Sequence, residues 1–235
     1  GIDRDIQAIN AAAEKLKEFG NRFHYKHGKF SGLKQYIEEL GWEKTDGILF
    51  DLGVSSAQID NPKRGFSFRF DAPLDMRMNR DEELTAAKLL NEKSQEELEK
   101  IIREYGEERK ARAIARRIVE RRKSKAWENT TELSELLEKV VGRRNQYGLP
   151  PATRTFQALR IAVNEELSEI EEALKSSLEV TAKGARIVLI SFHSLEDRMV
   201  KSFFSREAAS CVCPPTLPIC VCGKNANVKV LTKKP

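Results

Sequence analysis

The chain has 235 residues, of which 40% are hydrophobic and 33% charged, and its formal net charge is +5. This is a globular composition, long enough for one α/β domain with an insertion. No apolar run approaches the ~18 residues of a membrane span, and no signal peptide is recognisable. All four cysteines fall in one short cluster rather than a secreted disulfide framework, which predicts a cytoplasmic protein. The positive charge is compatible with a nucleic-acid partner but does not by itself establish one.

The chain begins with Gly1-Ile2, which is typical of the end of a strand, and the acid Asp3 follows directly. Apolar residues then recur at helical spacing from Ile6 to Phe19, and Gly20 ends that helix. An acid at the end of a strand in a Rossmann-like half commonly binds the ribose hydroxyls of a nucleotide. The alternative is that Asp3 caps the following helix.

A short strand is predicted at 23–25, followed by the loop 27–31. Phe30 in this loop is a candidate to lie against an adenine ring, because aromatic faces stack on bases, or else it is a core residue. The next helix runs from Leu33 to Leu40 and ends at Gly41.

The run Ile48-Leu49-Phe50 has no polar alternation, which predicts a parallel strand buried on both faces. Asp51 follows at its carboxyl end, where open α/β sheets bind ligands, although an acid there also caps turns. Gln58 and an unusually long loop, 64–78, come next. That loop is rich in Phe and Met, which favours a functional loop over a disordered one.

Residues 81–149 contain helical patterns and no strand signal. Ser94 opens one helix with a capping box, and another helix begins near Thr130 or Thr131. The helix between them carries a basic side that is a candidate for phosphate contacts, although interleaved glutamates also fit a solvated face. We call this side the basic helix face, and it consists of Arg109, Lys110, Arg112, Arg116, Arg117, Arg121, Arg122 and Lys123.

After Pro150-Pro151, apolar spacing from Phe156 to Leu178 predicts one long amphipathic helix. Ile187–Ile190 is a second buried strand, and His193 follows its carboxyl end. His193 has three candidate roles there: catalysis, RNA contact, or a purely structural one.

The cysteines have the spacing C-x-C-x6-C-x-C, at 211, 213, 220 and 222. Four thiolates are a zinc ligand set, but one-residue gaps are tighter than the usual two to four, so a zinc site stays an open alternative.

Several motifs occur together in one order and closely resemble the MraW/RsmH family. They are 1–5 (GIDRD), 51–56 (DLGVSS), 64–68 (RGFSF), 73–78 (PLDMRM), 105–108 (YGEE), 151–160 (PATRTFQALR) and 191–198 (SFHSLEDR). The resemblance covers nearly the whole chain. It implies an S-adenosylmethionine-dependent methyltransferase that acts on the exocyclic amino nitrogen of a decoding-centre cytidine in 16S ribosomal RNA.

The implied fold is α/β, a Rossmann-like class I methyltransferase sheet formed by residues 1–80 and 150–235. Residues 81–149 would be an inserted all-helical domain for RNA recognition. The family's first strand and Gly-rich loop have no counterpart here, so we expect them to precede Gly1, with the strand between those that end at Asp3 and Asp51.

By this resemblance, the cofactor contacts fall on Asp3, Phe30, Asp51 and Gln58. Direct methyl transfer requires no metal, but it needs an acceptor for hydrogen bonds from the target amino group. The first candidate for that acceptor is Asp51 or a neighbouring backbone carbonyl, and Asp75 and His193 are further candidates.

A target base inside structured RNA must be splayed out, and Phe66, Phe68 and Arg77 are candidates to stack on it. The partner would be 16S ribosomal RNA or the small ribosomal subunit, and the sequence does not give the oligomeric state. Two rival classes remain. One is a DNA amino-methyltransferase, against which the residues 51–54 (DLGV) count, and the other is a non-enzymatic RNA-binding or ribosome-assembly protein.

Overall fold

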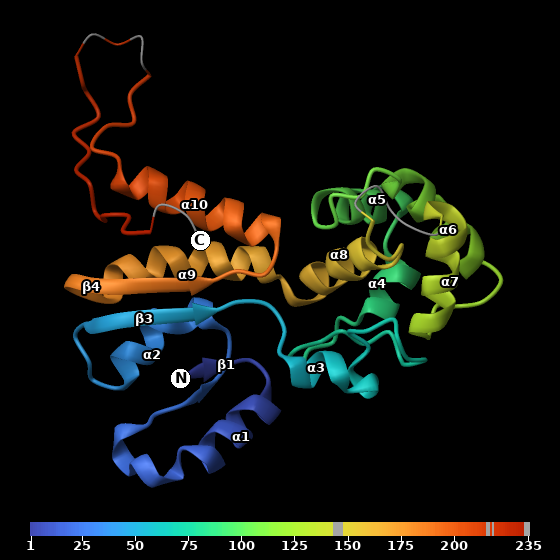
Figure 1. The fold of residues 1–235 in the computed structure, drawn as a ribbon, viewed down its shortest axis with the longest axis horizontal. Coiled ribbons are helices and arrows are strands. Elements are labelled where there is room, and N and C mark those ends of the chain that lie inside the picture. Colours follow the sequence, from blue (N-terminus) through green and yellow to red (C-terminus); the bar gives the residue numbers. More distant parts are fainter. Residues whose placement is uncertain (143–147, 215–216, 218, 233–235) are drawn as a thin grey trace. The chain divides into compact units, whose positions relative to one another are not determined.

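The computed structural model of the chain describes residues 1–142, 148–214, 217 and 219–232. Helices dominate this mixed α/β structure, and the described residues form two small two-stranded sheets (Figure 1). The chain divides into two compact units, which are described separately below. Unit 1 comprises Gly1, Asp3–His27 and Val54–Glu166, and unit 2 comprises Ile2, Gly28–Gly53 and Leu167–Pro235. Among the described residues, no helix is long and apolar enough to cross a membrane.

The chain begins with β1 (Ile2–Asp3), α1 (Ile6–Lys15), a 3₁₀ segment (Lys17–Arg22) and β2 (Lys26–His27). β1 pairs with β2, and the backbone N–H of Lys26 donates to the carbonyl of Gly1 over 2.9 Å. The strand predicted at 23–25 is therefore wrong by a few residues, because the segment that pairs with β1 starts at Lys26.

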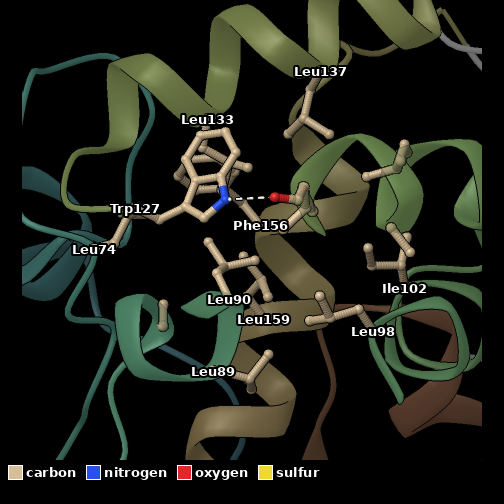
Figure 2. Close-up of a cluster of buried hydrophobic side chains, with 14 of the residues drawn as sticks. Leu74, Leu89, Leu90, Leu98, Ile102, Trp127, Leu133, Leu137, Phe156 and Leu159 are labelled. Carbon is tan, nitrogen blue, oxygen red and sulfur yellow. Dashed lines mark hydrogen bonds between the residues drawn. The ribbon is translucent and has the colours of Figure 1, made fainter. Parts of the chain in front are cut away.

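The rest of unit 1 is helical and encloses its own hydrophobic core (Figure 2). At its centre the indole N–H of the buried Trp127 donates to the carbonyl of Ile118 over 3.1 Å. The capping box at Ser94 and the helix start at Thr130 are confirmed. The boundaries of a separate inserted domain at 81 and 149 stay a prediction. The helices are α3 (Ser56–Asp60), α4 (Ala86–Glu92), α5 (Gln95–Glu104), α6 (Ala111–Arg122), α7 (Thr130–Val141) and α8 (Thr153–Asn164).

The long loop after α3 is packed into this helical core. Leu74 and Met76 are fully buried, and the backbone N–H of Leu74 donates to the backbone carbonyl of Glu128 over 2.8 Å. Gly65 has a φ of +70°, and a Cβ there would lie 2.2 Å from the Pro73 carbonyl oxygen. Only glycine fits that position, because the left-handed backbone and the close approach both exclude a side chain.

The single long helix predicted from Phe156 to Leu178 is wrong. The structure has α8 and a separate α9 (Glu166–Val180), divided at Glu165, which adopts a left-handed conformation. Asn164 explains the break, because its groups serve distant partners. Its carbonyl accepts from the guanidinium of Arg4, its side-chain amide donates to the Met76 carbonyl over 2.7 Å, and its Oδ1 accepts from the Met78 N–H over 2.7 Å.

Unit 2 is built on two parallel strands, β3 (Thr45–Asp51) and β4 (Thr181–Ile190). One face of this strand pair, which includes Phe50 of β3 and Leu189 of β4, packs against three helices. They are α2 (Leu33–Glu39), α9 and α10 (Ser194–Ala208). On the other face Leu49 is 64% exposed and Val188 49% exposed. The prediction that these strands are buried on both faces is therefore wrong for the described residues, because no hydrophobic cluster covers that second face.

Candidate functional site

The carboxyl ends of β3 and β4 bring two loops of unit 2 together. The strands are parallel with Asp51 opposite Ile190, and the N–H of Leu52 extends the ladder to the Ile190 carbonyl over 3.1 Å. Gly53 follows with a φ of +81°, and a Cβ there would lie 3.5 Å from the ring of Phe192. The loops after the two strands therefore contact each other at the edge where α/β proteins bind ligands.

Asp51 lies at this edge with an exposed side chain. Within the described residues its carboxylate forms no hydrogen bond or ion pair, so no turn is capped by it. An exposed carboxylate without a protein partner is available to accept hydrogen bonds from a ligand.

Phe192 is 65% exposed beside Gly53, which is unusual for a large aromatic side chain. The sequence analysis missed this residue. Its position directly after a strand, next to His193, is the signal that points to it.

His193 begins α10, where its Nδ1 accepts from the backbone N–H of Glu196 over 3.4 Å. The buried Glu196 carboxylate accepts in return from the N–H groups of Phe192 (2.7 Å) and His193 (3.3 Å), and its Oε1 lies 3.2 Å from His193 Nε2. Burial raises the pKa of Glu196, but the hydrogen bonds from His193 and Phe192 outweigh it and hold that pKa below its usual value. The contacts give His193 a structural role, and a direct part in catalysis or RNA contact stays a prediction.

Phe30 lies in the loop after β2 and is only partly buried. Its ring packs edge-on against Phe50, with centroids 6.0 Å apart. Glu169 holds the loop, accepting from the Ser31 N–H over 3.4 Å and pairing with Lys29 over 3.3 Å. Phe30 is thus partly a core residue, and a contact with adenine stays a prediction.

In unit 1, Asp3 is exposed at the end of β1. One carboxylate oxygen, Oδ1, accepts from the Asp5 N–H over 2.7 Å, and the carboxylate also interacts with the Arg4 N–H. Partial desolvation raises the pKa of Asp3. The N-cap of α1 is Asp5, which accepts from the Gln7 N–H, so the alternative that Asp3 caps this helix is wrong.

Asp5 connects Asp3 to a buried polar network that the sequence analysis missed. Its Oδ2 accepts from Gln58 Nε2 and from the Arg64 guanidinium, each over 2.7 Å. The second nitrogen of Arg64 donates to the carbonyls of Arg77 and Met78, each over 3.0 Å. Burial raises the pKa of Asp5, but the bonds from Gln58 and Arg64 outweigh it and lower that pKa. No local sequence pattern identifies these pairs, because their members lie far apart in the chain.

Gln58 is buried, and both ends of its amide are used within unit 1. Its Oε1 accepts from the Ser55 N–H over 3.1 Å as part of a capping box that opens α3. Gln58 therefore supports the network around Asp5, and a direct contact with a cofactor stays a prediction.

Asp75 differs from Asp51 because its carboxylate is buried and fully engaged. Arg77 donates to both oxygens, over 2.7 and 3.0 Å, and Arg80 lies 3.8 Å away. Burial raises the pKa of Asp75, but the bonds from Arg77 outweigh it and hold that pKa below its usual range. The guanidinium of Arg77 is occupied by this contact. Phe68 packs edge-on against Phe156 and so forms part of the hydrophobic core of unit 1.

The basic helix face defined from the sequence lies on α6 and the residues beside it, and we call it the α6 basic face from here on. Its side chains are of two kinds. Lys110 donates to the carbonyl of Val140 and Arg122 to that of Leu90, so both are anchored within the helical cluster. The Arg121 guanidinium lies 3.9 Å from the centroid of the Trp127 ring. These cations stabilise the fold rather than face a partner.

The remaining members of the face are exposed. Arg116 and Arg117 pair with Glu120, over 3.7 and 3.2 Å, in surface contacts that contribute little. Arg112 forms no ion pair within the described residues. The exposed cationic surface therefore includes Arg112 and is smaller than the sequence pattern predicts.

Carboxylates at the carboxyl ends of strands, beside loops held by buried polar contacts, define an α/β protein of the nucleotide- or cofactor-binding class. Comparison with known proteins narrows this class. The chain belongs to the MraW methylase family, whose sequence profile matches residues 1–235, and it is therefore a methyltransferase.

Curated relatives agree over the whole chain. Three proteins described as "Ribosomal RNA small subunit methyltransferase H" come from Heliobacterium modesticaldum, Caldicellulosiruptor bescii and Clostridium botulinum (strain Kyoto / Type A2). They are 52%, 54% and 49% identical to this chain. The matches cover 100% of this chain and 76% of each relative.

Proposed function

We propose that this methyltransferase uses S-adenosylmethionine to methylate the exocyclic amino nitrogen of a decoding-centre cytidine in 16S ribosomal RNA. The observation that carries the proposal is the identity of about half, over the whole of this chain, to relatives named for methylation of small-subunit ribosomal RNA. The proposed fold is a Rossmann-like methyltransferase domain with a helical insertion, and the proposed location is the cytoplasm, where ribosomal subunits of bacteria are made.

The residues of the chain fit this cofactor in two respects. Asp3 has an exposed side chain at the end of β1, which suits its carboxylate to accept hydrogen bonds from the ribose hydroxyls. One of its carboxylate oxygens accepts from the Asp5 N–H, and the carboxylate of Asp5 is itself fixed by Arg64 and Gln58. A fixed acceptor loses little entropy when it binds a ligand.

Asp51 is the acceptor that we assign to the target amino group. The lone pair of a cytosine amino nitrogen is delocalised into the ring, and hydrogen bonds from the amino protons to a carboxylate localise it. When bound, S-adenosylmethionine would supply the electrophilic methyl group that the nitrogen accepts. The nitrogen then loses a proton, which the exposed carboxylate of Asp51 would accept. The engaged carboxylate of Asp75 and the capping role of His193 make both less suited to this step.

Phe192 is proposed to stack on the extruded cytosine. Its exposed ring contacts the loop of Asp51 through Gly53, and stacking on an aromatic side chain is how proteins hold unpaired bases. Phe66 and Phe68 suit this role less, because both pack against the core of unit 1.

The test is transfer of a labelled methyl group from S-adenosylmethionine to naked 16S RNA and to isolated small subunits, with the product nucleoside identified by mass. Methylated cytidine in RNA is expected, and none in DNA of the same sequence. The variant Asp51→Ala should lose about 10²–10⁴-fold in kcat, the range for a positioned acid–base group. Asp46→Ala, an exposed acid at the other end of β3, should retain activity. A labelled base other than cytosine, or an unchanged kcat for Asp51→Ala, would refute the corresponding assignment.

A further inference from the structure

The segment after α10 brings all four cysteines of the chain together. The residues are Cys211, Cys213, Cys220 and Cys222, which we call the cysteine cluster. Their sulfur atoms all lie within 4.8 Å of one another. The sulfur of Cys220 is 4.0 Å from that of Cys213 and 3.5 Å from that of Cys222, which is 3.8 Å from Cys211. All four thiols are free rather than paired in disulfides.

This spacing is that of ligands around one tetrahedral ion. Zn–S bonds of about 2.3 Å in a tetrahedron place the sulfur atoms about 3.8 Å apart. The three distances lie on both sides of this value. An iron–sulfur cluster would hold its thiolates on more than one iron and thus farther apart. The cysteines are separated by only one residue within each pair. In the folded chain this spacing still allows all four sulfur atoms to bind the same ion.

The backbone supports the sulfur atoms in the way that metal–thiolate sites require. The N–H of Cys213 donates to the sulfur of Cys211 over 3.4 Å, and the N–H of Val221 to the sulfur of Cys213 over 3.5 Å. Hydrogen bonds of this kind orient the ligands and stabilise their negative charge.

The described part of the segment has few other contacts that could order it. Within its described part it contains neither helix nor strand, and its apolar side chains are exposed, with Ile219 at 74% and Val221 at 76%. Beyond the cysteines it returns to α10, where the N–H of Asn227 donates to the Glu207 carbonyl over 2.9 Å. A loop that buries no hydrophobic core needs a covalent or metal cross-link to hold one conformation.

We propose that the cysteine cluster binds one zinc ion as a closed, structural site that folds the segment between α10 and Asn227. Four protein ligands leave no open position, so the ion takes no part in methyl transfer. The proposal is independent of the proposed RNA substrate and cofactor.

The first test is the metal content of the intact protein. Protein purified under reducing conditions should contain one zinc ion per chain, and Co²⁺ exchanged into it should show the visible bands of a tetrahedral thiolate site. Cys213→Ser and Cys220→Ser should each lower the zinc content about tenfold or more. Val212→Ala, which changes a neighbouring side chain but no ligand, should retain it.

The second test needs no variant and so does not depend on a variant folding. Chelation of zinc from the wild-type protein should increase the reaction rate of the four thiols about tenfold, and added Zn²⁺ should reverse this. Trypsin should cut after Lys224 faster in the metal-free protein. Reduced protein that binds neither Zn²⁺ nor Co²⁺, that holds iron instead, or whose cysteines form disulfides in the cell would overturn the proposal.

Discussion

Arg64 donates to Asp5 over 2.7 Å, and both side chains are almost completely buried although 59 residues separate them. This ion pair connects the long loop after α3 with the start of α1. Because Asp5 also donates its N–H to Asp3, the same pair fixes the backbone beside the proposed ribose acceptor. A residue in the loop thus positions a residue at the end of the first strand.

Loss of this pair should destabilise unit 1. Arg64→Ala leaves the Asp5 carboxylate buried without its charged partner and frees two carbonyls, which typically costs about 3–5 kcal/mol. Urea unfolding should show this loss, whereas Lys63→Ala, at an exposed neighbour, should be close to neutral. The double variant Asp5→Ala/Arg64→Ala should lose less than the sum of the single variants. Additive losses would show that the two side chains are not coupled.

Stability should fall in acid because of three buried carboxylates, Asp5, Asp75 and Glu196. Each has a pKa that is lowered in the folded chain. A lowered pKa stabilises the folded state at pH values above the unfolded pKa, which is about 4, and this stabilisation is lost as the pH falls through the folded value. The free energy of unfolding should therefore decrease below about pH 5. Glu196→Gln should make the decrease shallower, and an equally steep curve would contradict the assignment.

Asp3→Ala should weaken binding of S-adenosylmethionine. Hydrogen bonds from ribose hydroxyls to a charged acceptor contribute about 1.5–3 kcal/mol, which isothermal calorimetry resolves easily. Asp60→Ala, at an exposed acid in the same unit, is the matched control. If Asp3→Ala binds the cofactor with normal affinity, Asp3 is not the ribose acceptor and has only a structural contact with the N–H of Asp5.

Charge reversal at Arg112 and Arg116 should weaken RNA binding and reduce its dependence on salt. Each lost phosphate contact lowers the slope of log K against log salt concentration by about 0.7–0.9. Cofactor affinity should not change. Arg103→Glu, on α5, is the control, because that side chain is also exposed but lies outside the α6 basic face. An unchanged slope would show that the face is only solvated.

Phe192→Ala should raise the KM for RNA with little effect on cofactor binding, because a base stacked on an aromatic side chain contributes about 1–3 kcal/mol. Trp42 provides the comparison, since it is also an exposed aromatic residue but precedes β3, at the other end of the strand. Phe192→Tyr should keep most of the activity if the ring stacks. Equal effects of Phe192→Ala and Trp42→Ala would indicate a general loss of structure.

The sequence by itself determined the features that depend on neighbouring residues. The strand around Ile48–Phe50, the capping box at Ser94 and the helix end at Gly41 follow from local periodicity and capping, and the structure confirms them. Ordered motifs along the chain also identified the family, because a series of short matches in one order is far more specific than any single one.

Only the tertiary structure decided the features that depend on distant partners. The break between α8 and α9 occurs because Asn164 binds Arg4 and the loop at 76–78, which no helical periodicity reveals. Asp51 and Asp75 look alike in sequence, yet one carboxylate is exposed and the other is enclosed by Arg77. The physical reason is that a hydrogen-bonding side chain takes its role from the partner that folding brings to it, and that partner can be far away in the sequence.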